Sequence, residues 1–289
     1  MGFLYSSVKK LAGNRNRVYH ELGDSLKKHN LAITLFTVAS SPLPYTEKLK
    51  KIREIGYRSI QSGLPPDGLE LGPYKTLLDE LEIEICAFSG RPDILFPSPG
   101  KFIEACRLFE CDEIMIGSMP VEYRENSDSY LRGIELLNKN ARILRKEGIY
   151  LSYHNHAQEF RKFSSGKRGI DLLFENLDSE AVRFLPDTHW LQAGGADILE
   201  WMDKFHGRMK YLHVKDYRLA PANYNTPISA VEKQFAQIGD GQLPWEMIIQ
   251  KGLELGIKAF IVEQDNCYNE DPFDCAAQSF SKLLSLGLS

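Results

Sequence analysis

The sequence predicts an α/β protein built as a single (β/α)₈ (TIM) barrel, and three observations carry the prediction. The 289 residues are 43% hydrophobic and 26% charged, which is an ordinary globular composition. Short apolar runs recur eight times along the chain, and the segments between them have helical periodicity. Barrels of this kind commonly form one domain of about this length. We expect the barrel domain over residues 31–289 and an N-terminal extension over residues 1–30.

The eight apolar runs are rich in β-branched and aromatic residues and are the predicted strands. In order, they are Leu31–Val38, Tyr57–Leu64, Ile83–Ser89, Glu113–Ser118, Ile149–Asn155, Val182–Asp187, Met209–Asp216 and Ala259–Asp265. They are far enough apart for a helix and two loops to separate each pair. Their near-continuous apolar character indicates a parallel sheet that is buried on both faces.

The segments between the strands show helical spacing of apolar residues and helix-ending glycines. The clearest predicted helices are Thr46–Ile55, Ser129–Glu147, Ala196–Phe205 and Trp245–Leu255. Gly56, Gly148 and Gly256 follow three of them in the position where a glycine often ends a helix. Strand and helix therefore alternate eight times, which closes a barrel. The alternative is a doubly wound sheet, but no glycine-rich phosphate turn follows the first strand.

Charge and cysteine usage limit the classes of partner and compartment. The formal net charge is −4, whereas a nucleic-acid-binding protein normally shows a basic excess or stripe. The basic residues of the extension are interpreted as solvated surface. The five cysteines are odd in number and have no CxxC spacing, which is typical of reduced, buried thiols in a cytoplasmic protein. No stretch approaches the length of a membrane span.

Polar groups concentrate at the ends of the last four predicted strands. The fifth ends in Tyr153-His154-Asn155-His156, with Glu159 shortly after, and the sixth ends in Asp187. The seventh carries His213 and Lys215, and the eighth carries Glu263 and Asp265. Because the carboxyl ends of barrel strands share one mouth, these groups should converge there. Imidazole and carboxylate together suit Mn²⁺, Zn²⁺, Co²⁺ or Fe²⁺ better than Ca²⁺.

Each of these residues also has a simpler interpretation. A single histidine is more often a hydrogen-bonded, half-buried side chain, and Asp187 could begin a helix. Glu263 lies inside an apolar strand, where a buried carboxylate must be paired or bound to metal. An ion pair with Lys215 would satisfy it without a metal. Taken together, Asp187, His213 and Glu263 favour a metal site.

At this point the residues resemble those of the sugar phosphate isomerase/epimerase family, the xylose isomerase-like TIM barrels. The resemblance is strongest to a subgroup with a Tyr-His-Asn-His-x-x-Glu-Phe run on strand five, here Tyr153–Phe160. It covers roughly residues 31–285. The other matching stretches are Asp187–Asp197, His213–Asp216, Ile238–Trp245 and Ile261–Asp265. These motifs are specific for the superfamily but not for one reaction, because its members include epimerases, isomerases, dehydratases and lyases.

The resemblance implies four metal ligands, one from each of strands five to eight. Three carry over as Asp187, His213 and Glu263. The fourth is His154 or, if its loop folds back, Glu159, with His154 favoured. Two departures put substrate recognition in doubt. Trp190 stands where many relatives have a histidine, which here is His189, and Gln237 stands where relatives often have a glutamate.

The resemblance implies a metal-dependent enzyme acting on a sugar, keto-sugar or polyol through a metal-stabilised enediolate, as an isomerase or epimerase or as a related lyase or dehydratase. Mn²⁺ is the favoured ion. Glu159, His156 or Glu263 would carry the proton, and Lys215 would supply positive charge. Histidine both accepts and donates a proton near neutral pH, which suits the loss of a leaving group. We therefore expect elimination at least as strongly as epimerisation, with His156 or Glu159 carrying the proton.

Two other functions remain open at this stage, namely a non-catalytic sugar-binding barrel and an AP endonuclease-type nuclease. The nuclease would need more metal ligands and a basic groove. We expect the chain to bind a small-molecule sugar or polyol, and neither nucleic acid nor a membrane. A homo-oligomer remains open as an alternative to the monomer.

Overall fold

The structure is a computed structural model that describes residues 30–220, 225 and 227–289. Its main sheet has eight parallel strands, and the prediction of eight strands in one (β/α)₈ barrel is confirmed. The strands are β1 (Leu31–Thr34), β2 (Ser59–Ser62), β3 (Glu84–Ser89), β4 (Glu113–Ile116), β5 (Tyr150–His154), β6 (Val182–Leu185), β7 (Tyr211–Val214) and β10 (Ala259–Val262). The predicted extension over residues 1–30 lies outside the described residues, Asn30 apart, and stays a prediction.

The strands form a nearly closed ring. Their order is β6-β5-β4-β3-β2-β1-β10-β7, so the first strand pairs with both the second and the last. Between β6 and β7 the ring is joined by two isolated parallel bridges, Phe184 with Met209 and Asp187 with His213. The chain end helps to hold the first strand, because the Asn30 and Leu31 amides both donate to the Ser289 carbonyl.

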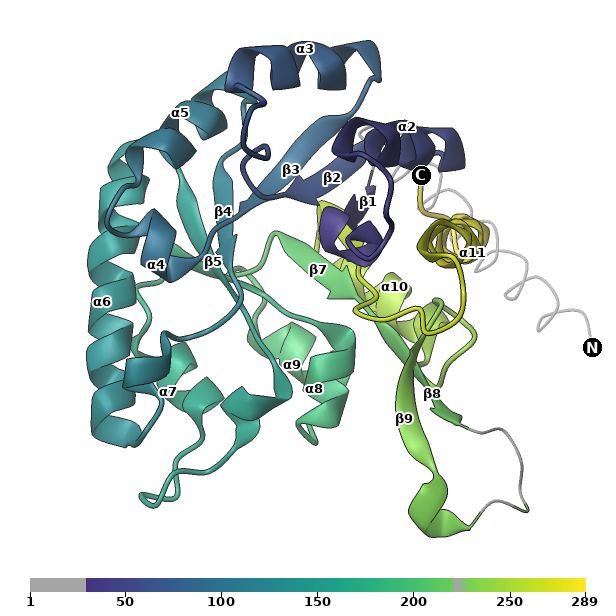
Figure 1. Ribbon diagram of the computed structural model, residues 1–289. Coiled ribbons are helices and arrows are strands. Elements are labelled where there is room, and N and C mark those ends of the chain that lie inside the picture. The colour runs from purple at the N-terminus through teal and green to yellow at the C-terminus, as the bar shows by residue number, and fades with distance from the viewer. Residues whose placement is uncertain (1–29, 221–224, 226) are drawn as a thin grey trace, which may run out of the picture.

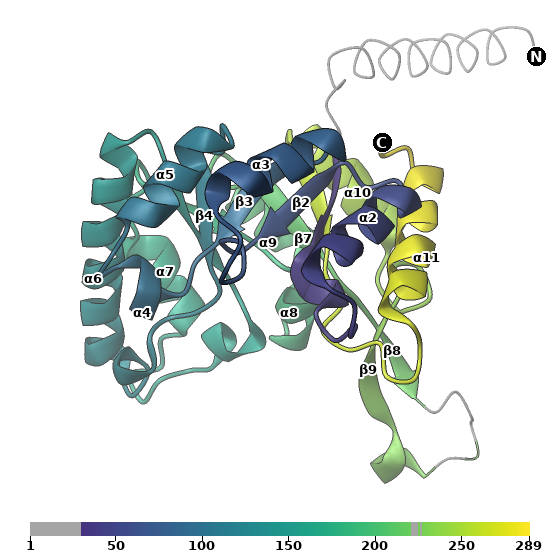
Figure 2. The same cartoon turned by 45° about the horizontal axis from the view of Figure 1, so that its top comes forward.

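Helices cover the outside of the ring, as Figures 1 and 2 show from two directions. They are α2 (Tyr45–Ile55), α3 (Leu71–Glu80), α4 (Pro92–Leu95), α5 (Gly100–Leu108), α6 (Ser127–Lys146), α7 (Gly169–Asn176), α8 (Thr188–Ala193), α9 (Ile198–Lys204), α10 (Trp245–Glu254) and α11 (Pro272–Ser285). Short 3₁₀ turns follow three strands as η1 (Leu35–Val38), η2 (Val121–Tyr123) and η3 (Ala157–Phe160). Within the part of the chain that the structure describes, no helix is both long enough and apolar enough to cross a membrane.

Two apolar clusters follow from the alternation of side chains along each strand. The larger cluster includes Leu151, Tyr153, Leu212 and Phe260 with helix residues such as Leu137, and it fills the space between strands and helices. The smaller cluster consists of Ala32, Ala87, Met115, Leu185, Tyr211, Ala259 and Ile261. Its members alternate with those of the larger cluster, so they face the inside of the barrel. This inner packing supports the polar groups one step further along the same strands.

Besides shifts of one to three residues at other element ends, the structure departs from the predicted elements in three places. The run Leu31–Val38 is a strand only to Thr34, whose hydroxyl accepts from the Phe36 amide and starts the η1 turn. Helix α2 begins at Tyr45, after Pro44, rather than at Thr46. The third difference is an antiparallel hairpin of β8 (Asp216–Ala220) and β9 (Glu232–Ala236), which was not predicted. It projects beyond the barrel in Figures 1 and 2, and a short turn, η4 (Ile228–Ala230), precedes its second strand.

Candidate metal centre

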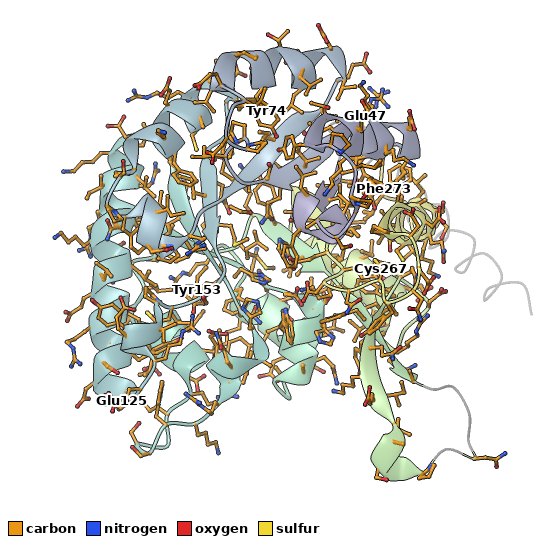
Figure 3. The ribbon with its side chains drawn as sticks, in the orientation of Figure 1. Glu47, Tyr74, Glu125, Tyr153, Cys267 and Phe273 are labelled. Carbon is orange, nitrogen blue, oxygen red and sulfur yellow. The ribbon has the colours of Figure 1, made fainter. Side chains whose placement is uncertain are left out.

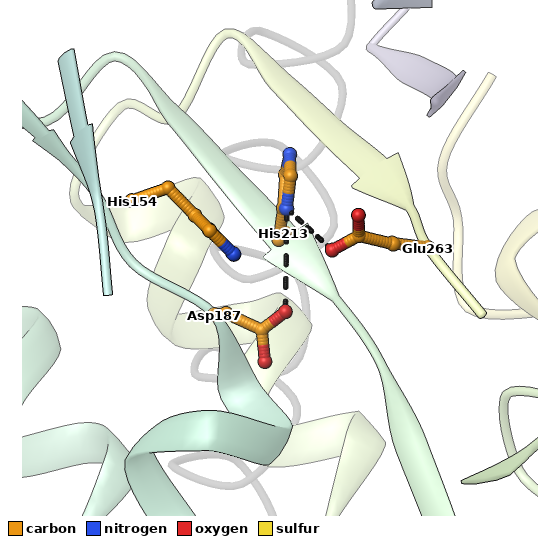
Figure 4. Close-up of side chains that lie close together, drawn as sticks. All are labelled: His154, Asp187, His213 and Glu263. Atoms are coloured by element: carbon orange, nitrogen blue, oxygen red, sulfur yellow. Dashed lines mark hydrogen bonds and ion pairs between the residues drawn. The ribbon is translucent and has the colours of Figure 1, made fainter. Parts of the chain in front are cut away.

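Four buried side chains from four neighbouring strands meet at the carboxyl end of the barrel. His154 ends β5, Asp187 follows β6, His213 lies in β7 and Glu263 follows β10. One ligand atom from each side chain lies within 4.8 Å of those of the other three. Figure 4 shows the four side chains pointing toward a common space from different ribbons. The structure therefore brings together the four residues that the sequence predicted as ligands, with His154 rather than Glu159 in the fourth position.

The alternation of the strands explains why these side chains share one space. Along β7 and its extension, Tyr211, His213 and Lys215 lie on the same side of the strand, and Ile261 and Glu263 do so on β10. Tyr211 and Ile261 belong to the inner apolar cluster. The next inward positions are therefore His213 and Glu263, directly above that cluster. A parallel barrel places all such positions at one mouth.

Lys215 places a positively charged ammonium group in this centre. Its ammonium lies 2.8 Å from Glu263 Oε2, 2.9 Å from Asp265 Oδ1 and 3.4 Å from Asp187 Oδ2. The side chain is 1% exposed, so these ion pairs are shielded from water. Three carboxylates around one ammonium leave two negative charges in a buried site. A divalent cation would neutralise them.

The same crowding shifts the ionisation of the acids and the lysine. Burial, opposed by Lys215, raises the pKa of Asp187 to about 6. Burial also acts on Glu263, but Lys215 and His213 outweigh it and hold its pKa well below the ordinary value. Burial would lower the pKa of Lys215, yet Asp187, Glu263 and Asp265 together raise it. The lysine is therefore charged at neutral pH.

Both ring nitrogens of His213 have polar neighbours. Nδ1 lies 2.9 Å from Glu263 Oε2 and 4.0 Å from Asp187 Oδ2, and Nε2 lies 2.7 Å from Gln61 Oε1. The amide nitrogen of Gln61 donates to the Ser89 hydroxyl at 2.9 Å, which orients its oxygen toward the histidine. A proton on Nε2 would then donate to Gln61, leaving the Nδ1 lone pair for a ligand. Sequence reasoning missed Gln61; its only signal was a buried amide in the second strand.

The side chains of the cluster fit a divalent cation. Several buried polar side-chain atoms of the described residues have no hydrogen-bond partner, and two of them, Asp187 Oδ2 and His154 Nδ1, belong to the four-residue cluster. Buried polar atoms are rarely left unpaired, because they lose their bonds to water on burial. Asp187 Oδ2 has an ion-pair contact with Lys215 at 3.4 Å but no hydrogen bond among the described residues, so the cluster holds a weakly paired carboxylate oxygen and an unpaired imidazole nitrogen. Two imidazoles and two carboxylates are the ligand types of Zn²⁺, Mn²⁺, Fe²⁺ and Co²⁺ sites.

Glu159, the alternative fourth ligand, is occupied elsewhere. Its carboxylate accepts from the Tyr153 hydroxyl at 3.0 Å, from the His156 amide at 2.7 Å and from the Gln158 side chain at 3.2 Å. Tyr153, labelled in Figure 3, also accepts from the Met119 amide at 2.9 Å. Burial raises the pKa of Glu159. Through these hydrogen bonds Glu159 stabilises the turn after β5.

His156 lies next to the cluster without belonging to it. Its ring centroid is 4.7 Å from that of His154 and 5.3 Å from that of Trp190. Burial, and then the charge of Lys215, lower the pKa of His156 to about 4, so the imidazole is neutral at neutral pH. Its Nδ1 is buried and has no hydrogen-bond partner among the described residues. A neutral imidazole beside the centre is able to accept a proton.

The two departures from the family pattern occupy distinct places. Trp190 packs on His189 with ring centroids 4.6 Å apart, and both rings lie beside the hairpin. The side chain of Gln237 donates to Glu270 at 2.8 Å and to Cys275 Sγ at 3.1 Å. Trp190 therefore borders the centre, whereas Gln237 joins the loop after β9 to the segment that follows β10.

Comparisons with known proteins agree with this fold. A family model described as a xylose isomerase-like TIM barrel matches residues 49–280. Inosose dehydratase of Geobacillus kaustophilus is 28% identical over 156 residues, which is 52% of this chain and 49% of that protein. Inosose dehydratase of Geobacillus thermodenitrificans is 27% identical over 207 residues, 67% of each chain. The chain thus spans about half the length of the first of these relatives.

Solved structures show the same architecture. A sugar phosphate isomerase/epimerase from Parabacteroides distasonis aligns with a TM-score of 0.70 at 21% identity, covering 88% of this chain and 93% of that one. A structure of the IOLI protein with a bound zinc atom aligns with a TM-score of 0.69 at 12% identity, covering 89% of this chain and 97% of that one. At these identities the likeness concerns the fold alone.

Proposed function

Because the chain belongs to the family of xylose isomerase-like TIM barrels, we propose that it is a metal-dependent enzyme acting on a sugar, keto-sugar or polyol. The observation that carries the proposal is the buried cluster of His154, Asp187, His213 and Glu263 at the barrel mouth. Such a cluster lies where barrel enzymes have their active sites. A divalent cation would neutralise its excess negative charge, and Mn²⁺ fits the mixed nitrogen and oxygen donors, as do Zn²⁺, Co²⁺ and Fe²⁺.

The cation would polarise a substrate carbonyl and so make the neighbouring C–H bond acidic. Lys215 would add a second positive charge next to the same oxygen, since its ammonium already lies against Glu263 and Asp187. With the lysine held by three carboxylates, its position is set before the substrate arrives. Lys215 therefore acts by charge in this proposal.

His156 is the proposed proton carrier. It is neutral, half-buried and adjacent to His154, and its Nδ1 is unpartnered among the described residues. Glu159 would act as a positioning residue, because its carboxylate holds the His156 amide. Glu263 remains the second candidate for proton transfer.

The reaction we favour is elimination of water from a cyclic keto-polyol, with epimerisation as the alternative. In the elimination, His156 takes the proton from the carbon next to the carbonyl. The C–O bond at the following carbon breaks, and its oxygen leaves as water after the protonated His156 returns that proton to it. The similarity of the chain to the inosose dehydratases of the two Geobacillus species supports this choice.

The test is proton exchange and product formation in D₂O. The chain, loaded with Mn²⁺, is incubated with an inosose and a panel of keto-sugars, and mass spectrometry measures deuterium uptake and loss of water. We expect both with the inosose, and neither after chelation or with Asp187→Asn. A metal-loaded chain that leaves every compound unlabelled and intact would contradict the proposal and favour a non-catalytic sugar-binding barrel.

A second measurement concerns the fourth ligand. His154→Ala should lower the bound metal well below one ion per chain, whereas Glu159→Ala should retain it, because the Glu159 carboxylate is engaged by Tyr153 and His156. Elemental analysis of the purified variants reports both. Loss of metal in Glu159→Ala with normal metal in His154→Ala would reverse the assignment.

A further inference from the structure

The hairpin β8–β9 carries an aromatic wall at the mouth of the barrel. Only Lys215 separates β8 from β7, so the hairpin continues a barrel strand past the metal centre. Tyr217 and Phe235 are directly paired across its two strands and so lie on one face. The Phe235 ring lies 5.0 Å from His189 and 5.9 Å from Trp190, centroid to centroid. Tyr217 lies 5.4 Å from His189.

The aromatic wall, defined here as His189, Trp190, Tyr217 and Phe235, adjoins the metal centre through Lys215. The Lys215 ammonium lies 5.1 Å from the centroid of Trp190 and 5.7 Å from that of Phe235. The same ammonium is 2.8 Å from Glu263. A molecule that reaches the cluster would therefore have these rings beside it.

Two polar atoms of the wall lack partners. Trp190 Nε1 and His189 Nδ1 are buried, and neither has a hydrogen-bond partner among the described residues. Isolated polar groups set in an aromatic surface match a polyol ring, whose C–H face is apolar and whose hydroxyls need partners. An unpaired buried group is costly, so a ligand hydroxyl there would be stabilising.

The wall is held in place without a ligand. The Phe235 amide donates to the Tyr268 hydroxyl at 3.0 Å, and Arg218 pairs with Glu270 at 3.2 Å. These contacts join both hairpin strands to the segment after β10. The rings are thus ordered in advance, which lowers the entropic cost of binding a ligand against them.

We propose that Phe235 is a specificity-determining residue that selects cyclic polyols and cyclic keto-polyols over open-chain sugars. The inference rests on the proposed function and adds the residue that selects the ring form of the substrate. A six-membered ring offers a flat C–H face that stacks on Phe235 in one piece, while the Trp190 ring, at 76° to Phe235, lies along its edge. An open chain must lose the freedom of several rotatable bonds to present the same surface.

The experiment measures binding and does not depend on turnover. Calorimetry of the metal-loaded chain compares myo-inositol, a cyclic polyol, with sorbitol, an acyclic polyol that also has six carbons. The wild-type chain should bind myo-inositol roughly tenfold more tightly than sorbitol, the size expected for an aromatic contact. Phe235→Leu, which keeps an apolar side chain but removes the ring, should lose most of that preference, and Phe235→Tyr should retain it.

Gln234→Ala is the matched control, because Gln234 is the neighbouring residue on the opposite face of β9. It should keep the preference, and all variants should keep the wild-type metal content and melting temperature. Equal affinity of the wild type for the two polyols overturns the inference, as does an unchanged preference in Phe235→Leu. Failure of the proposed function appears separately, as a chain without bound metal or without exchange in D₂O.

Discussion

At the scale of single residues, the centre is built from ligands and from partners that orient them. The four clustered side chains would bind the cation directly. Gln61 touches none of the carboxylates but lies 2.7 Å from His213 Nε2, across the barrel on β2. Partners of this kind set the tautomer and the orientation of a ligating imidazole. Gln61 is therefore expected to matter for metal affinity although it is not itself a ligand.

We predict that Gln61→Leu lowers metal affinity roughly 10- to 100-fold, the usual effect of removing such a partner. The reason is that His213 Nε2 loses its acceptor, so the ring is free to adopt the other tautomer or to rotate. Titration of the apo chain with Zn²⁺ against a competing chelator measures the affinity. Ser59→Ala, two residues earlier on the same strand, is the control and should bind metal normally. Equal affinity of Gln61→Leu and wild type would show that Gln61 does not orient the ligand.

At the scale of elements, Asp216 joins the hairpin to the loop that follows it. Its buried carboxylate accepts from the amides of Gly239, Gln242 and Leu243 at 3.1–3.3 Å and from Trp245 Nε1 at 2.5 Å. One acid thus gathers the donors of a whole turn and fixes the start of α10. The segments around Asp216 and Trp245, which lie far apart in the sequence, are thereby joined.

We predict that Gly241→Ala destabilises this junction. A Cβ at position 241 would lie 2.1 Å from Asp216 Oδ1 and 2.4 Å from the Tyr217 carbonyl, so the loop must move. The free energy of unfolding should fall by roughly 1–3 kcal/mol, as for overpacking elsewhere. Chemical denaturation measures it, with Gly72→Ala as the matched control, because a Cβ there meets nothing within 4 Å. If both variants unfold at the same denaturant concentration, the close approach has no energetic consequence.

At the scale of the whole molecule, the two ends of the barrel do different work. The carboxyl end holds the proposed metal centre and the aromatic wall. Near the amino end, the fully buried Glu113 accepts from the Ser152 hydroxyl and from Arg183 at 2.7 Å. Arg183 also lies over the Tyr150 ring, 3.4 Å from its centroid. Residues at the amino end of a barrel contribute to stability, whereas the active site lies at the carboxyl end.

We predict that Glu113→Ala lowers the free energy of unfolding by roughly 2–4 kcal/mol, because it leaves Arg183 and Ser152 without their buried partner. Metal content per folded chain should stay at the wild-type level. Thermal denaturation and elemental analysis report the two quantities. Asp187→Asn is the opposite case and should lose metal while the apo chain stays as stable as the wild type, since one crowded carboxylate is neutralised. A Glu113→Ala chain that is fully stable but metal-free would refute this division of roles.

The sequence alone was sufficient for the barrel and for the residues at its mouth. Strands such as Ala259–Asp265 are predicted from their apolar composition. Helices such as Ser129–Glu147 are predicted from the helical spacing of their apolar residues. Once eight parallel strands are recognised, topology alone brings Asp187, His213 and Glu263 to one end. The strand-five position was left between His154 and Glu159, because a turn can direct either side chain inward.

Only the tertiary structure decided the contacts between distant segments. Glu159 turns to Tyr153 and the His156 amide, Gln61 reaches His213 from across the barrel, and Lys215 joins three carboxylates. The hairpin was missed because β8 follows β7 after a single residue, so the two read as one strand that ends in polar residues. Phe235 becomes visible as a neighbour of Trp190 only when that hairpin folds back. Local pattern determines which elements form and which end of each strand is polar, but the pairing of buried charges and rings depends on distances that exist only after the barrel has closed.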